Sequence, residues 1–251
     1  MLPRDLGTSQ SLYVILRPPA REGSRNVHAW TRPLRMCEHV GMRPIQAELL
    51  AGGELYREVV LSKLAHARES VWIATANVKA MYVKQGERYV PLLQVLDGLA
   101  ARGVALRLLH AELPSGPFRA EFDRRARLVK GGLELKVCPR VHFKAVLVDG
   151  AWAYLGSANL TGAGLGAKGE DVRNFEMGFV TEDFDVIDRT TALFESVWSG
   201  AECRGCRLRE VCPDPILPAD AREAPSRGAS GVRLGQTRRL ARKGSSWRTG
   251  R

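Results

Sequence analysis

A histidine and a lysine two residues apart, His142 and Lys144, are the side chains of this sequence best suited to chemistry on an anion. They lie in the apolar run from Val141 to Val148, which predicts a β-strand, and residues two apart in a strand point to the same face. An imidazole can act as a nucleophile, and an ammonium beside it can neutralise negative charge. The pair therefore predicts a site for attack on a phosphate or a similar anion.

The residues that follow predict a return of the chain to this pair. Asp149-Gly150 is a strong signal for a two-residue hairpin turn, which would bring the segment from Gly156 to Asn159 beside His142. The glycine of that segment allows close approach of a ligand, and its serine and asparagine supply polar donors. Phosphodiesters resist attack because their oxygens are anionic, so a catalyst must neutralise that charge and position a nucleophile. The whole set predicts a phosphodiester site.

The spacing of these residues resembles the motif of the phospholipase D superfamily, H-x-K-x4-D-x6-G-S-x-N. The matching residues are His142, Lys144, Asp149, Gly156, Ser157 and Asn159. The resemblance extends more loosely over residues 55–200, including VWIATANVK and NFEMGF, where Glu176 matches the downstream acidic position of the family. It implies an α/β fold, specifically an α/β/α sandwich with a mixed central sheet. It also implies catalysis through a covalent phosphohistidine on His142, with no metal in the reaction.

The same resemblance implies a role for each residue of the motif. The phosphate would be bound by Lys144, Gly156, Ser157 and Asn159. Asp149 and Glu176 would orient or tune the histidine and the lysine, within one protomer or across a dimer.

A second histidine must protonate the leaving oxygen and later activate water, and the family takes it from a second copy of the motif. This chain has one copy, because no other histidine is followed by lysine two positions on; the others are His28, His39, His66 and His110. A chain with one motif can complete the site by pairing two protomers about a twofold axis. We therefore expect an obligate homodimer, similar to the small dimeric bacterial endonucleases of the superfamily.

The elements that must position these groups alternate between helix and strand, which is typical of an α/β sheet. The apolar spacing predicts helices over residues 55–64, 92–99, 117–130 and 184–198. It predicts strands over residues 71–76, 104–109, 133–137, 141–148, 152–155 and 175–180. The glycine-rich stretch at 161–172 predicts a loop near the strand ends.

The basic charge of the chain is concentrated at its C-terminal end. The formal net charge is +11, and residues 220–251 hold nine basic and two acidic side chains. Such a tail can bind polyanions, and both nucleic acid and an anionic membrane surface qualify, although a solvated disordered end has the same composition. We expect a poorly structured extension at 1–45, a phospholipase D-like catalytic domain at 46–200, a cysteine-rich metal-binding segment at 201–216 and a basic disordered tail at 217–251.

Three cysteines after the last predicted helix, Cys203, Cys206 and Cys212, form the pattern C-x2-C-x5-C. Thiolates at this spacing can converge on one metal. The segment resembles the C-terminal clasp of some nucleases that hold a four-iron cluster, whose fourth cysteine lies far upstream. Cys37 is the candidate for that position and Cys138 is the alternative. An iron–sulfur cluster, zinc and free thiols all stay open, and any metal here would be structural.

The sequence has no apolar run near the roughly 18 residues that span a bilayer, and its N-terminus is a poor signal peptide. We therefore expect a cytoplasmic protein without a transmembrane segment. The function favoured is a metal-independent nuclease that acts on DNA or RNA. The alternatives are a phospholipase D or phosphatidyl transferase that acts on lipid, and a catalytically silent nucleic-acid-binding protein.

Overall fold

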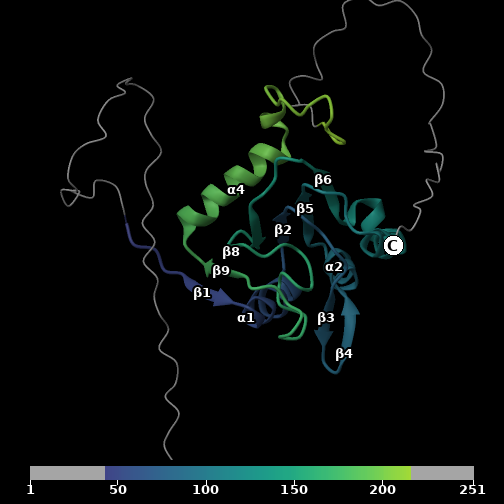
Figure 1. Cartoon of the computed structure of the whole chain (residues 1–251), viewed down its shortest axis with the longest axis vertical. Helices are drawn as coiled ribbons and strands as arrows, with labels where there is room; N and C mark the ends of the chain where they lie inside the picture. The colour runs from purple at the N-terminus through teal and green to yellow at the C-terminus, as the bar shows by residue number, and fades with distance from the viewer. Residues whose placement is uncertain (1–42, 216–251) are drawn as a thin grey trace, which may run out of the picture. The chain divides into compact units, whose positions relative to one another are not determined.

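A seven-stranded mixed sheet forms the centre of the protein (Figure 1). The structure is a computed structural model, and it describes residues 43–215. The strand order is β1-β9-β8-β7-β2-β5-β6, in which β2, β5 and β6 are parallel and every other neighbouring pair is antiparallel. The strands of this sheet are β1 (Glu48–Ala51), β2 (Ser70–Thr75), β5 (Ala105–His110), β6 (Glu134–Val137), β7 (Lys144–Val148), β8 (Trp152–Gly156) and β9 (Met177–Thr181).

Helices cover both faces of the sheet, with α2 and α4 on opposite sides in Figure 1. The helical elements are α1 (Gly53–Leu55), η1 (Tyr56–Lys63), η2 (Leu64–His66), α2 (Leu92–Ala101), α3 (Gly116–Asp123), η3 (Leu128–Gly132), α4 (Phe184–Trp198) and η4 (Ala201–Cys203). Side chains alternate along β2, so that Ile73 packs with Leu55 and Leu96 on one face, while Trp72 packs with Phe194 of α4 on the other. The expected α/β/α sandwich is confirmed.

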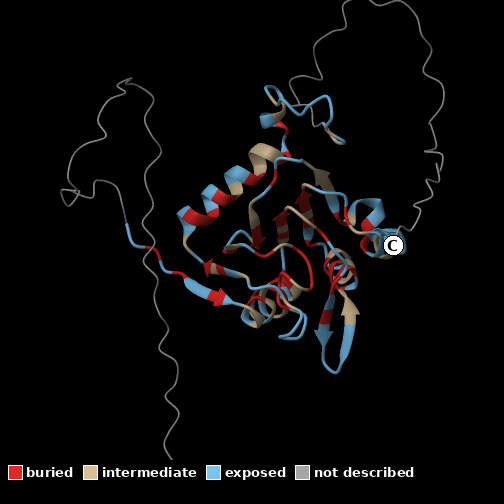
Figure 2. Ribbon diagram, viewed as in Figure 1, coloured by how far each residue is buried: buried red, intermediate tan, exposed pale blue. Residues whose placement is uncertain are grey.

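Buried residues run along the central strands and the inner sides of these helices, as Figure 2 shows. The helices end where local chemistry requires it. Asp183 caps α4 by accepting a hydrogen bond from Val186 N–H, and Ser115 caps α3 in the same way from Phe118 N–H. Gly103, with φ at +87°, follows α2 and suits the left-handed conformation at a helix end. No helix in the described range 43–215 is long and apolar enough to cross a membrane.

Two predicted elements have different bounds in the structure. The helix expected at 117–130 is interrupted: α3 ends at Asp123, and η3 begins at Leu128. No glycine or proline at 124–127 signals this break. The strand expected to begin at Val141 begins instead at Lys144, because Val141 N–H donates to Cys138 C=O in a tight turn. His142 therefore lies in the loop before the strand.

Three strands were not predicted at all. β1 is an outermost strand of the sheet and pairs with β9. Its four residues are too few to show a clear alternation of apolar and polar side chains. β3 (Tyr82–Gln85) and β4 (Arg88–Pro91) form a separate hairpin. The glycine of its turn, Gly86, has φ at +58°. Alternation of apolar and polar residues on both sides of a glycine is the sequence signal for such a hairpin.

The turn between β7 and β8 forms at the predicted place, but three residues and not two separate the strands, because Val148 pairs with Trp152. Asp149 and Gly150 both have positive φ, at 54° and 63°, and Ala151 N–H donates to Val148 C=O at 3.1 Å. The Asp149 carboxylate also accepts hydrogen bonds from the backbone N–H groups of Arg68, Glu69 and Ser70, which precede β2. Partial burial raises the pKa of Asp149, but these donors outweigh burial and hold the pKa below its ordinary value.

We predict that Asp149→Ala lowers the free energy of unfolding by about 2 kcal/mol at pH 7, because three backbone donors lose their acceptor. The pKa of Asp149 is lower in the folded state than in the unfolded state, so this contribution is present above about pH 4 and is lost as pH falls through the folded pKa. Urea unfolding at pH 7 and pH 3 measures it. Asp149→Asn, which keeps one acceptor oxygen and tolerates positive φ, should lose less. A destabilisation of equal size at both pH values would contradict this account.

Candidate active site

Every residue of the histidine–lysine motif except Asp149 lies at one edge of the sheet, where β2 and β8 end and β7 and β9 begin. Lys144, the first residue of β7, pairs with Gly156, the last residue of β8. Gly156 in turn pairs with Gly178 of β9. His142 precedes β7 by two residues, and Asn159 follows β8 by three. The hairpin therefore brings both halves of the motif to the same edge.

His142 and Lys144 lie next to each other, although only the lysine is in the strand. The Lys144 ammonium donates a hydrogen bond to the backbone C=O of His142 at 2.7 Å. His142 is exposed, and Lys144 is half-buried. The cation is thus held beside the backbone that carries the imidazole, and the imidazole itself faces solvent, where a substrate or a second protomer can reach it.

Asn159 has its amide oxygen fully engaged by the end of β2. The oxygen accepts hydrogen bonds from the Thr75 hydroxyl, Ala76 N–H and Asn77 N–H, each at 3.2 Å. Because all three partners donate hydrogen bonds, the amide atom that they contact is the oxygen and not the nitrogen. The NH₂ group remains to donate to an anion. Asn159 is therefore oriented before any ligand arrives.

Ser157 and Glu176 form a hydrogen-bonded pair at the same edge of the sheet. The Ser157 hydroxyl donates to one oxygen of the Glu176 carboxylate, and Asn174 donates to the other at 3.1 Å. Ser157 N–H also donates to Met177 C=O at 3.0 Å. Since the serine hydroxyl already has a carboxylate partner, it serves to hold Glu176 and to join β8 to β9. Glu176 is half-buried beside the anion-facing groups.

Gly156 is required by a buried side chain of the protein itself. A Cβ at this position would lie 2.3 Å from the Tyr154 hydroxyl oxygen and 2.7 Å from Met177 C=O. The Tyr154 hydroxyl accepts a hydrogen bond from Ala158 N–H at 3.3 Å, and burial raises the pKa of Tyr154 to about 12. The Tyr154 ring is therefore a packing reason for this glycine, and the approach of a ligand to it stays a prediction.

Asp149 lies away from the site. It follows the last residue of β7, whereas Lys144 is the first residue, so the length of the strand separates them. Its carboxylate is occupied by the backbone before β2. The structure therefore does not bring Asp149 to His142 or Lys144 within the protomer, and its observed contacts are structural.

Cationic residues surround the site on two sides. A hollow of about 230 Å³ is lined by Asn159 and two exposed lysines, Lys79 and Lys168. A second hollow of about 770 Å³ contains Arg57 and Arg173 together with the serine–glutamate pair described above. Asn174 lines both hollows, so they adjoin at the edge of the sheet. Arg173 is also ion-paired with Glu170 at 2.8 Å. The second hollow also contains the carboxylates of Glu54, Glu170 and Glu176, so the hollow with Lys79 and Lys168 is the net cationic one of the two and suits an anion.

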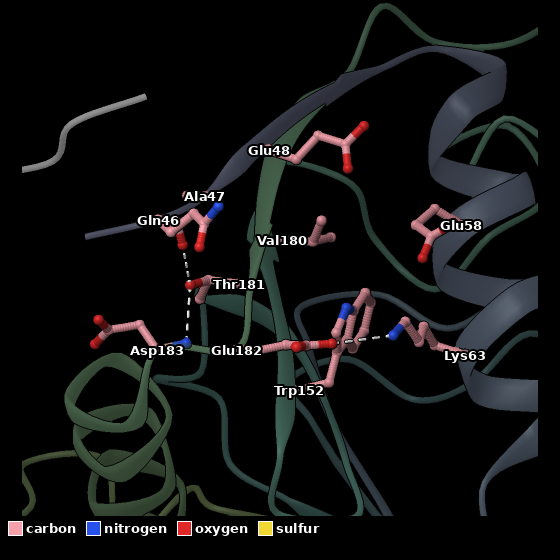
Figure 3. Close-up of a pocket in the computed structure, with 10 residues that line it drawn as sticks. All are labelled: Gln46, Ala47, Glu48, Glu58, Lys63, Trp152, Val180, Thr181, Glu182 and Asp183. Carbon is pink, nitrogen blue, oxygen red and sulfur yellow. Dashed lines mark hydrogen bonds and ion pairs between the residues drawn. The ribbon is translucent and has the colours of Figure 1, made fainter. Parts of the chain in front are cut away.

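A different hollow, of about 460 Å³, lies at the other ends of β8 and β9 (Figure 3). It is lined by four carboxylates and one ammonium; the charged residues are Glu48, Glu58, Glu182, Asp183 and Lys63. The ammonium of Lys63 is paired with Glu182 at 3.3 Å and lies 5.7 Å from the centre of the Trp152 ring. Such a net negative lining repels a phosphodiester. The hollow beside Asn159, with its two lysines, suits a phosphate better than this one does.

Three residues of the site were missed by sequence reasoning: Thr75, Asn77 and Asn174. Thr75 is 1% exposed and also accepts a hydrogen bond from Leu160 N–H at 3.0 Å. A threonine at the end of the apolar run VWIAT is a weak signal for this role, since threonine is common in strands. These residues act on Asn159 and Glu176 and do not belong to the motif, so its spacing does not indicate them.

The cysteines predicted to bind metal lie elsewhere. Cys203, Cys206 and Cys212 are in the segment after α4, and all three have free thiols. Cys37 lies outside the described residues. No described cysteine lines the hollows beside the motif, although Cys138 directly follows β6 and lies four residues before His142.

Comparison with protein families identifies one match. The family described as "Cardiolipin synthase, PLD-like domain" matches residues 60–198, more than half of the 251 residues. This range contains every residue of the histidine–lysine motif. No curated protein matches the chain.

Solved structures similar to the chain include two bacterial proteins. Nuc from Salmonella typhimurium, a phospholipase D family member, is 19% identical, with a TM-score of 0.45 over 61% of this chain and 95% of that one. NucT from Helicobacter pylori is 15% identical, with a TM-score of 0.46 over 61% of this chain and 96% of that one. Phosphatidylserine synthase from Haemophilus influenzae is also 15% identical, with a TM-score of 0.42 over 61% of this chain and 39% of that one.

We predict that Asn159→Asp keeps the fold and loses anion binding. The aspartate retains an oxygen that accepts the three hydrogen bonds, so the melting temperature should stay within a few degrees of the original. The NH₂ donor becomes a second anionic oxygen, so affinity for tungstate, a phosphate analogue, should fall at least about tenfold by isothermal titration calorimetry. Asn159→Ala should lose both stability and binding. Unchanged tungstate affinity in Asn159→Asp would show that the amide does not face the anion.

Proposed function

The chain belongs to the family of phospholipase D-like domains, and from that membership we propose that it cleaves nucleic acid through a covalent phosphohistidine on His142. The observation that carries the proposal is the arrangement at one edge of the sheet. An exposed imidazole, the Lys144 ammonium and the oriented amide of Asn159 lie at the same ends of neighbouring strands. These groups are the ones that displacement at a phosphodiester requires.

In the first step, an imidazole nitrogen of His142 attacks phosphorus while the bond from phosphorus to the leaving oxygen breaks. Lys144 and Asn159 donate to the non-bridging oxygens, whose charge they stabilise. The leaving oxygen takes a proton from a second, protonated imidazole. The products of this step are an alcohol end of the substrate and a phosphohistidine.

In the second step, the imidazole that gave up its proton removes one from water, and the water oxygen attacks the phosphohistidine. The bond between nitrogen and phosphorus breaks, and His142 returns to its starting state. Both steps use only side chains, so the reaction needs no metal. Glu176, held by Ser157 and Asn174, places a negative charge at the same edge of the sheet.

The second imidazole would come from His142 of another copy of the chain. Two apolar residues at the rim of the site support pairing there: Phe175 is fully exposed, and Met177 is 55% exposed. They flank Glu176 on either side. Large apolar side chains left in water beside an incomplete site are expected at an interface, where a second protomer would bury them.

A nucleic-acid substrate is favoured over a lipid by the distribution of charge. Lys79 and Lys168 line the hollow beside Asn159 with no carboxylate among its lining residues, and they suit a second phosphate of a polymer. The basic tail at 217–251, which lies outside the described residues, would add contacts to such a polymer.

We predict that the protein cleaves single-stranded DNA, duplex DNA or RNA in the presence of EDTA, and that His142→Asn lowers the rate by at least about a thousandfold. Gel assays of each nucleic acid, beside assays of phosphatidylcholine vesicles, measure this. His66→Gln is the matched control, because His66 is exposed and its ring bonds to Ser62 C=O in the helix before β2. Release of phosphatidate alone would assign the enzyme to lipid, and binding of nucleic acid without product from either protein would assign it a binding role.

We predict that Phe175→Glu separates the protomers and lowers cleavage at least about tenfold, since charge at a buried interface opposes association. Sedimentation equilibrium and the cleavage assay measure the two effects. Phe184→Glu is the control: Phe184 is 75% exposed but begins α4, beyond the opposite end of β9 from Met177. A monomeric wild-type chain with full activity would refute the shared site.

A further inference from the structure

Four of the five cysteines in the chain line one small cavity, which we call the cysteine cluster. Its members are Cys138, Cys203, Cys206 and Cys212. The first directly follows β6, and the other three lie in the segment that follows α4, which Figure 1 shows in yellow-green beyond the end of that helix. All four thiols are free and half-buried. The cavity measures about 20 Å³, which is enough space for one water-sized ligand.

The segment at 201–215 has no apolar core of its own to hold it in place. None of its side chains is buried. It is attached to β6 by a few polar contacts, of which one is the bond from Val137 N–H to the Asp214 carboxylate at 3.2 Å. Just before the segment, the Lys136 ammonium donates to Trp198 C=O at 2.5 Å. Short segments without a core usually need a disulfide or a metal to stay ordered.

Hydrogen-bond donors point at the sulfur atoms of the cluster. The backbone N–H of Arg140 donates to the Cys138 sulfur, and the Arg140 side chain bonds to Cys206. Donors of this kind stabilise thiolates and are typical of the groups around a metal ligand. One arginine thus connects the sulfur on the β6 side with a sulfur on the α4 side.

We propose that the cysteine cluster binds one metal centre through four thiolates and thereby fastens the segment at 201–215 to the end of β6. A set of four thiolates suits zinc and iron–sulfur clusters alike. Among residues 43–215, no three histidine, cysteine or acidic side chains already have the spacing of an occupied coordination sphere. A cysteine has one side-chain torsion, so its sulfur can move to a ligand position by rotation about the Cα–Cβ bond.

This assignment puts Cys138 in the place that sequence reasoning gave to Cys37. It also connects the metal centre with the edge of the sheet that carries the motif residues. Cys138 N–H donates to the C=O of His110, the last residue of β5, at 2.8 Å, and its own C=O accepts from Val141 N–H, directly before His142. A metal on Cys138 would therefore hold the end of β5 at His110 and the loop that leads to His142. Its role is positioning, since no cysteine lines the hollows beside the motif.

The test begins with the full-length chain, expressed with iron and zinc in the medium and purified without oxygen. Elemental analysis should find about one zinc per chain, or about four iron with matching sulfide and a broad absorption near 400 nm. Cys138→Ser and Cys206→Ser should each lose most of that metal. Cys37→Ser is the matched control and should keep all of it.

A measurement on the unaltered chain covers the case in which the serine variants do not fold. Alkylation with iodoacetamide, followed by peptide mass spectrometry, should label Cys37 at once. The four cysteines of the cluster should be labelled only after the metal is removed by a chelator or a mercurial. Absence of metal in the purified chain, formation of two disulfides within the cluster, or loss of metal from Cys37→Ser but not from Cys138→Ser would each overturn the proposal.

Discussion

The antiparallel pairing of β7 with β8 is the constraint on which the rest of the site depends. Asp149 and Gly150 adopt positive φ in the three-residue turn at 149–151, and the pairing of Val148 with Trp152 across it fixes the register in which Lys144 faces Gly156. A slip of one residue would send every side chain of the hairpin to the opposite face of the sheet. The carboxylate of Asp149 also anchors the turn to the backbone before β2, so the central strand and the hairpin are aligned together. Its place in the motif is explained by this alignment.

At the edge of the sheet that carries the motif residues, the polar side chains are held in place before any substrate binds. The Asn159 oxygen is held by the end of β2, and the Glu176 carboxylate is held by Ser157 and Asn174. The amide oxygen of Asn159 is held by the protein so that its NH₂ can donate to an anion, whereas both oxygens of Glu176 are held by neighbouring side chains. Donors fixed in this way need no reorganisation when charge develops on phosphate oxygens. The exposed nucleophile and the apolar rim remain for a second protomer to complete.

The sequence alone predicts the features that depend on local pattern. The helix at 184–198, the turn at Asp149-Gly150 and the placement of His142 beside Lys144 follow from periodicity, turn chemistry and motif spacing. Features that depend on contacts between distant segments are not predictable in this way. Examples are the binding of Asp149 to the backbone before β2, the need for Gly156 above the Tyr154 ring, and the position of Cys138 beside cysteines that follow α4. None of these has a signature within one stretch of sequence.

The covalent intermediate is the central claim of this account, and rapid quenching tests it most directly. The enzyme is mixed with excess nucleic acid for a fraction of one turnover, denatured at alkaline pH and digested, and its peptides are analysed by mass spectrometry. We predict a phosphoryl-linked nucleotide on the peptide that contains His142, which forms and decays at the rate of turnover. Cleavage with no adduct at any time, or with an adduct on another residue, would contradict the proposed mechanism.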